Sequence, residues 1–136
     1  KYTYLLIIII FIYLINAISI QNNENCFIVN DKTTKEGTIL TINGIGKMCS
    51  CQPHDLQQYQ SSIETIIFGE SITSIGSNCF NNFNRVKSIQ FGNSITEIKQ
   101  YAFYKSSLET ITIPKSINLI FFVISTNNTF SGFKSQ

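Results

Sequence analysis

Three residues capable of metal or redox chemistry lie close together in the chain: Cys49, Cys51 and His54. Two thiolates and an imidazole are ligands that zinc prefers, and Cys26 could complete such a site. The spacing matches no common zinc pattern, and in an oxidising compartment cysteines form disulfides instead. Cys26 can pair with Cys49 or Cys51, and closing a loop of that length contributes about 3 kcal/mol. We therefore predict a disulfide among Cys26, Cys49 and Cys51, and no metal.

The fourth cysteine, Cys79, occupies the position that Ala102 holds in a later copy of an internal repeat. This equivalence predicts a small core residue. The three remaining cysteines then form one bridge and leave one residue over, which the sequence does not identify.

No arrangement of residues typical of an enzyme accompanies these cysteines. His54 is the one histidine, and it has no serine or cysteine partner in a recognised catalytic order. The carboxylates are scattered rather than paired, and Gly44-Ile45-Gly46 lacks the lysine and helix start of a phosphate loop. We predict a protein that is not an enzyme and needs no cofactor. A metal-dependent enzyme built on the Cys/His motif is the alternative.

The elements that carry these residues are dominated by a repeat of about 23 residues. One copy runs from Ser62 to Phe80 and a second from Arg85 to Phe103, while a third opens at Ser107 and loses the pattern after Ile117. A repeat of this length indicates coils that stack on one another. The predicted fold is a mainly β solenoid of about two and a half coils over residues 62–120.

Each copy predicts the same local structure. Glu64–Phe68 alternates as a strand that buries Ile66 and Phe68. Gly69 and Gly92 follow the strands at a turn, where glycine allows positive φ. Residues 76–80 suit one helical turn with its aromatic side chain pointing inward. The apolar positions shared by the copies are Ile63, Ile66, Phe68, Ile72, Ile75 and Phe80, then Val86, Ile89, Phe91, Ile95, Ile98 and Phe103, then Leu108, Ile111, Ile113, Ile117 and Ile120.

The outward-facing residues of the first strand in each copy form a candidate ligand-binding face. These residues are Thr65, Ile67, Ser88, Gln90, Thr110 and Thr112. Solenoids use a flat strip of this kind for binding, although a solvated sheet face without a ligand would look the same. Beside it, Glu64, Lys87 and Glu109 form a column of alternating sign, which avoids like-charge neighbours.

Two segments precede the repeats. Residues 1–19 combine a positive start, an apolar run and a small-residue Ala-x-Ser site, which is typical of a cleaved signal peptide. An uncleaved membrane anchor and a buried strand are the alternatives. Residues 20–61 are expected to hold a β-hairpin, Cys26–Asn30 with Thr38–Ile42 across a turn at Asp31–Gly37, followed by a polar link. Such a hairpin would cap the first coil.

The motifs Ile63-Glu-Thr-Ile-Ile-Phe68, Ser71-Ile-Thr-Ser-Ile-Gly76, Ala102-Phe103 and Leu108-Glu-Thr-Ile-Thr-Ile-Pro114 resemble those of the BspA-like leucine-rich repeats. The resemblance covers about residues 26–120. It implies a secreted or cell-surface protein of bacteria or parasitic protists that binds proteins and adheres to host or neighbouring cells. The family carries no catalytic residues to transfer.

The net charge and the C-terminal segment bear on which partners the protein could bind. A net charge of +2 without a Lys/Arg cluster gives no reason to expect nucleic acid. Residues 121–136 are expected to form an irregular tail, in which Asn127 is a glycosylation candidate. Without a cap, the strand of the last copy would present an open edge that invites self-association. A short structural repeat that only self-associates there is the alternative function.

Overall fold

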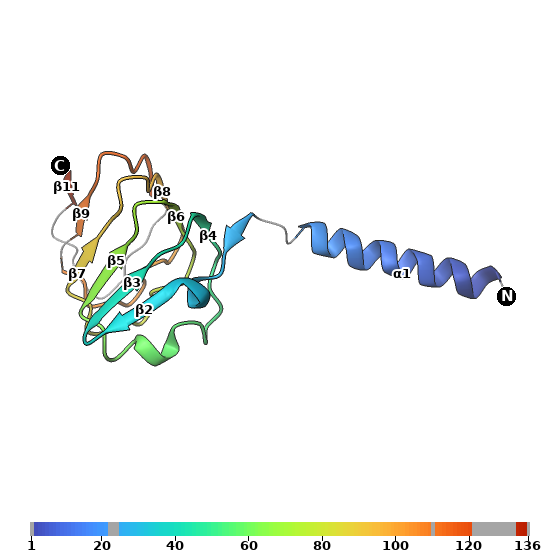
Figure 1. Ribbon diagram of the computed structural model, residues 1–136, viewed down its shortest axis with the longest axis horizontal. Helices are drawn as coiled ribbons and strands as arrows, with labels where there is room; N and C mark the ends of the chain where they lie inside the picture. The colour runs from blue at the N-terminus through green and yellow to red at the C-terminus, as the bar shows by residue number, and fades with distance from the viewer. Residues whose placement is uncertain (1, 22–24, 110, 121–132, 136) are drawn as a thin grey trace.

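Two sheets of mainly parallel strands form the sides of a β-solenoid (Figure 1). The computed structural model describes residues 2–21, 25–109, 111–120 and 133–135. One sheet has the strand order β2-β3-β5-β7 and the other β1-β4-β6-β8-β10, while β9 and β11 form a third pair. The strands are β1 (Cys26–Phe27), β2 (Thr33–Glu36), β3 (Ile39–Ile42), β4 (Gly46–Met48), β5 (Thr65–Phe68), β6 (Ile72–Ile75), β7 (Ser88–Gln90), β8 (Glu97–Ile98), β9 (Ile111–Ile113), β10 (Leu119–Ile120) and β11 (Phe133–Ser135).

Each coil contributes one strand to the first side of the solenoid and the next strand to the second side. Ile66 of β5 is the register partner of Ile89 in β7, and Ser74 of β6 is that of Glu97 in β8. These partners are one repeat apart, so equivalent positions of the copies lie side by side. The predicted solenoid is confirmed.

The core lies between the two sheets and follows the predicted alternation. Ile66 and Phe68 are buried on β5, whereas Thr65 and Ile67, which alternate with them, are only half-buried. Phe80 and Phe103 point inward from the turns of two successive coils, and their rings stack with centroids 5.4 Å apart. Burying such aromatic side chains supplies much of the free energy that holds the coils together.

The hairpin at the start of the solenoid uses different residues from those predicted. β2 and β3 pair antiparallel, with Thr33 opposite Ile42 and Glu36 opposite Ile39. The turn between them includes Gly37, whose φ of 57° is left-handed. Cys26–Phe27 instead pairs with Lys47–Met48 on the other side of the solenoid. A 3-10 helix, Val29–Lys32, carries the chain from one side to the other, where the end of a strand and the start of a turn were expected. The rest of the expected turn, up to Glu36, is the strand β2.

The connections predicted as helical turns are chains of tighter turns. Backbone N–H groups at Asn78, Phe80 and Asn82 donate to carbonyl oxygens of Gln100, Ala102 and Tyr104 in the next coil. These donors therefore bond between coils rather than within a helix. Four residues there have φ near 60°, namely Asn78, Asn82, Tyr101 and Lys105. The inward direction predicted for the aromatic side chains is nevertheless confirmed.

Close stacking, rather than positive φ, explains the glycine at position 92. Gly69 and Gly92 are absent from the residues with positive φ. A Cβ atom on Gly92 would lie 2.3 Å from the carbonyl oxygen of Gly69. Real Cβ atoms do not approach a backbone oxygen so closely, so the turns of successive coils can stack only because this position lacks a side chain.

The C-terminal segment contains a strand, so it is not wholly irregular. β11 pairs parallel with β9, with Phe133 opposite Ile111. The partner lies about one 23-residue period further along the chain, which is the spacing of a further coil. β11 therefore occupies an edge of β9, and the expectation of an open edge at Ile111 is wrong. Asn127 lies outside the described residues.

The N-terminal segment forms a helix that stands apart from the sheets (Figure 1). This helix is α1 (Tyr2–Gln21), and each of its apolar residues from Tyr4 to Ile12 has an exposed fraction between 49% and 77%. The buried strand considered for residues 1–19 is therefore wrong. In the part of the chain that the structure describes, no helix meets the length and apolarity needed to cross a membrane.

Candidate ligand-binding face

The predicted face lies on the outer side of the β2-β3-β5-β7 sheet and continues at β9. Thr65 on β5 is the register partner of Ser88 on β7, and Ile67 is the partner of Gln90. Ser88, Gln90 and Thr112 are exposed, whereas Thr65 and Ile67 are half-buried. Thr110 lies outside the described residues. The structure thus brings four of the six predicted residues together on paired strands, with Thr112 on β9.

Two further residues belong to the same outer side and were missed. On β3, Ile39 is the register partner of Thr65, and Thr41 is the partner of Ile67. Ile39 is 40% exposed and Thr41 is half-buried. Their neighbours Leu40 and Ile42 are fully buried, as Ile66 is on β5. The alternation in Thr38–Ile42 could have revealed them, because it matches that of the repeats.

The predicted residues of the face carry no charge. Glu36, the register partner of Ile39 on the edge strand β2, is charged, and a cluster of charged residues lies where β5 and β7 begin. An Nη2 atom of Arg85 lies 2.9 Å from Oε1 of Glu64, and the Lys87 ammonium lies 3.6 Å from the same oxygen. The predicted pairing of Glu64 with Lys87 across two coils is confirmed. The hydrogen bond from Arg85, followed by the charge of Lys87, holds the pKa of Glu64 below its ordinary value of 4.5.

Replacing Arg85 by methionine is expected to raise the pKa of Glu64, because the Glu64 carboxylate loses the hydrogen bond that lowers its pKa most. A carboxylate with a lowered pKa favours the folded state above its unfolded pKa, and this contribution is lost as the pH falls through the folded pKa. The Arg85→Met variant should therefore lose less stability on acidification than the parent. A carboxyl ¹³C NMR titration of Glu64 measures the change directly.

Lys115→Met is the matched control, because it removes one exposed positive charge from a residue outside this cluster. It should leave the Glu64 titration unchanged. Equal titration curves for the parent and Arg85→Met would show that the ion pair does not exist in solution.

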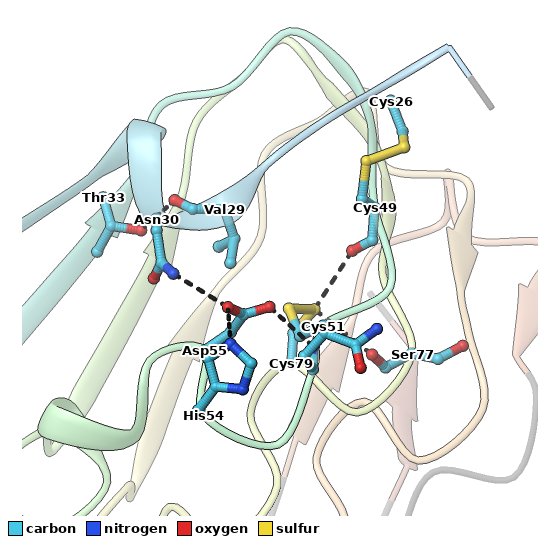
Figure 2. The surroundings of a disulfide bond; sticks show 11 residues. Cys26, Val29, Asn30, Thr33, Cys49, Cys51, His54, Asp55, Ser77 and Cys79 are labelled. Atoms are coloured by element: carbon cyan, nitrogen blue, oxygen red, sulfur yellow. Dashed lines mark hydrogen bonds and ion pairs between the residues drawn. A yellow bond between two sulfur atoms is a disulfide. The ribbon is translucent and has the colours of Figure 1, made fainter. Parts of the chain in front are cut away.

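The cysteine motif is structural. Cys26 bonds to Cys49, and Cys51 bonds to Cys79, so the four cysteines form two disulfides (Figure 2). The first is one of the two pairings predicted. The second is a correction, because Cys79 was expected to be an unpaired core residue. Cys79 is indeed only 1% exposed, but its sulfur meets Cys51 of the preceding coil.

Both thiols of the Cys49-x-Cys51-x-x-His54 motif are consumed by these bonds, so neither is a thiolate that could bind zinc. The His54 side chain is 79% exposed and lies 3.9 Å from Asp55 (Figure 2). Asp55 also accepts hydrogen bonds from the Asn30 amide at 3.2 Å and from the Gln52 backbone at 2.8 Å. Among the described residues, no group of three His, Cys, Asp or Glu side chains is placed to hold a metal ion. The disulfides and the hydrogen bonds of Asp55 therefore stabilise the loop before the first repeat.

Stacked coils of one short strand per side, with an uncharged outer strip, define a leucine-rich-repeat solenoid of the kind that mediates protein–protein interaction. The chain belongs to the family described as "BspA type Leucine rich repeat region (6 copies)", whose model matches residues 56–134. Proteins of this family are typically secreted or found on the cell surface, and they are typically not enzymes.

Comparison with solved structures finds a leucine-rich repeat protein from Eubacterium ventriosum with 25% sequence identity and a TM-score of 0.35. The match covers 62% of this chain and 35% of that one, so this chain spans about a third of its length. Among proteins of curated function, none matches the chain significantly.

Proposed function

We propose that the protein is secreted or held at the cell surface, where it binds a protein ligand and so attaches its cell to host or neighbouring cells. The observation that carries this proposal is the uncharged strip formed by Thr65, Ile67, Ser88, Gln90 and Thr112 in a family of interaction repeats. The strip lies on strands whose inward-facing side chains pack in the core. Its own side chains remain available to a ligand.

Three features support the extracellular location. The two disulfides require an oxidising compartment to form and persist. Residues 1–19 have the composition of a signal peptide, and Asn127 lies in an acceptor triplet for glycosylation. These features are independent of one another and agree.

A protein ligand suits this surface better than a nucleic acid. The net charge of the chain is only +2, and phosphate backbones are bound by clusters of positive charge. Hydroxyl and amide groups on a flat sheet can form hydrogen bonds with backbone and side chains of another protein. The half-buried Ile67 and the exposed Ile39 add apolar area to this surface.

The proposal has two tests. The first stains intact producing cells with an antibody to residues 62–113, and surface or secreted protein is expected. The second coats beads with the full-length protein and counts their adhesion to producing cells and to cultured epithelial cells. Adhesion should fall after the cells are treated with protease, because the ligand is a protein.

A triple variant, Ser88→Glu, Gln90→Glu and Thr112→Glu, should reduce bead adhesion at least about tenfold, since it buries three charges in the contact. Ser50→Glu, Ser71→Glu and Gln100→Glu is the control, with the same charge change at exposed positions away from the face. It should adhere like the parent. Staining only after permeabilisation without secreted protein, or equal adhesion of both triple variants, would refute the proposal.

A further inference from the structure

The face contains a hollow where the second coil meets the third. The hollow has a volume of about 200 Å³ and lies between β7 and β9, which are neighbours in Figure 1. Its apolar lining is Ile89, Phe91 and Pro114, and its polar lining is Gln90, Asn93 and Thr112. Two of these polar residues, Gln90 and Thr112, belong to the face described above.

A change of side chain between the coils accompanies the hollow. Phe68 and Phe91 occupy equivalent positions, and their rings stack with centroids 5.8 Å apart and planes 6° apart. The equivalent position in the third coil holds Ile113, which has no ring to continue the stack. Phe68 is 2% exposed, but Phe91 is only half-buried and lines the hollow. The row of stacked rings thus ends at Phe91, beside empty space.

A hydrogen bond to the preceding coil holds the rim of the hollow in place. The backbone N–H of Asn93 donates to Oε2 of Glu70 in the preceding coil at 2.8 Å, which positions the loop after β7. Among the residues that the structure describes, none that lines the hollow is ionisable, and the Glu70 carboxylate that accepts this bond is not part of the lining. A charged side chain entering the hollow would lose part of its hydration, and no described lining residue offers it a counter-charge. An uncharged guest avoids this cost.

The size of the hollow suits a single ring. A cavity of about 150 Å³ lined by apolar side chains is large enough to bind benzene. We propose that the hollow receives one uncharged aromatic side chain of the protein ligand, which stacks on Phe91 as Phe91 stacks on Phe68. This inference rests on the proposed function and names the residue type that anchors the ligand. The amide and hydroxyl groups of Gln90, Asn93 and Thr112 are part of the lining and can form hydrogen bonds with the ligand backbone.

The test uses N-acetylphenylalaninamide as the probe and ¹⁵N-labelled full-length protein. Saturable shifts of the Gln90 and Asn93 side-chain amide signals are expected, with a dissociation constant of about millimolar for so small a ligand. N-acetyllysinamide, which is charged, should give no saturable shift at these signals. Absence of saturation with the phenylalanine probe, or equal binding of the lysine probe, would overturn the proposal.

Two variants locate the binding. Thr112→Trp adds bulk to the lining of the hollow and should weaken probe binding about tenfold. Ser50→Trp adds the same bulk at an exposed position away from the face and should leave probe binding unchanged. Phe91→Leu keeps an apolar floor but removes the ring, so the phenylalanine probe should bind roughly two- to tenfold more weakly. Binding of N-acetylleucinamide should be unaffected by this change. Circular dichroism checks that each variant is folded.

The outcomes separate the two proposals. If beads carrying the parent protein adhere and the Glu triple variant does not, but Thr112→Trp adheres and binds the probe like the parent, the face is correct and the aromatic anchor is wrong. If the probe binds as expected but no cell retains the beads, the hollow is correct and the adhesive function is wrong.

Discussion

Replacing Phe80 by alanine is expected to lower the free energy of unfolding by about 3–5 kcal/mol. The ring of Phe80 is fully buried, and its centroid lies 5.3 Å from that of Phe68, 5.6 Å from that of Phe83 and 5.4 Å from that of Phe103. Truncation removes contacts to three rings from two coils and leaves a cavity that close-packed neighbours cannot fill. Urea unfolding followed by circular dichroism measures the loss.

A loss of this size is a large part of the stability of a small domain, which is about 5–15 kcal/mol. Phe80→Leu therefore accompanies the alanine variant and should cost roughly 1–2 kcal/mol. Phe91→Ala is the control at a half-buried ring, and it should cost less than Phe80→Ala. If both alanine variants lost the same stability, Phe80 would not be the centre of the core.

Removing the disulfide between Cys51 and Cys79 by a double alanine substitution is expected to cost about 3–4 kcal/mol. The two residues are 28 apart in the chain, and the chain-entropy estimate for closing a loop of that length falls in this range. The bond links the segment before the repeats to the first copy. Both residues are buried, with 6% of Cys51 and 1% of Cys79 exposed, so their packing is lost as well.

The double variant Cys26→Ala and Cys49→Ala is the matched control, since its bridge spans 23 residues. It should cost slightly less, because Cys26 and Cys49 are only half-buried. Non-reducing digestion and mass spectrometry should recover a peptide pair joined through Cys51 and Cys79. If Cys79 were instead an unpaired core residue, no such pair would form, and a reducing agent would leave the stability of the Cys26/Cys49 variant unchanged.

Much of the solenoid could be predicted because its information is local and repeated. The alternation at Thr65–Phe68 shows which side chains of β5 enter the core, and the next copy shows the same choice at Ser88–Gln90. A repeat also predicts which residues become neighbours, since stacking aligns equivalent positions. For this reason the pairing of Thr65 with Ser88 and the contact of Glu64 with Lys87 both follow from the sequence.

The errors have a common physical origin, because each concerns a contact between coils that no local sequence pattern reveals. Cys26–Phe27 alternates weakly enough to pair with several strands, and its choice of Lys47–Met48 depends on how the chain crosses the solenoid. The glycine at position 92 is required by the carbonyl of Gly69, which no local pattern reveals. The strand β11 follows a stretch in which the repeat motif had faded.

The cysteines and the outer strip show the same division between what the local sequence predicts and what depends on contacts between coils. The sequence by itself determined that the strip is uncharged and that Cys26, Cys49 and Cys51 lie near one another. Only the tertiary structure decided that Cys79 reaches Cys51 and that the row of rings ends beside a hollow at Phe91. A periodic pattern specifies the direction of each side chain, because direction is a property of the local backbone. Disulfide partners and hollows depend on distances between coils, and these distances exist only after the coils have stacked.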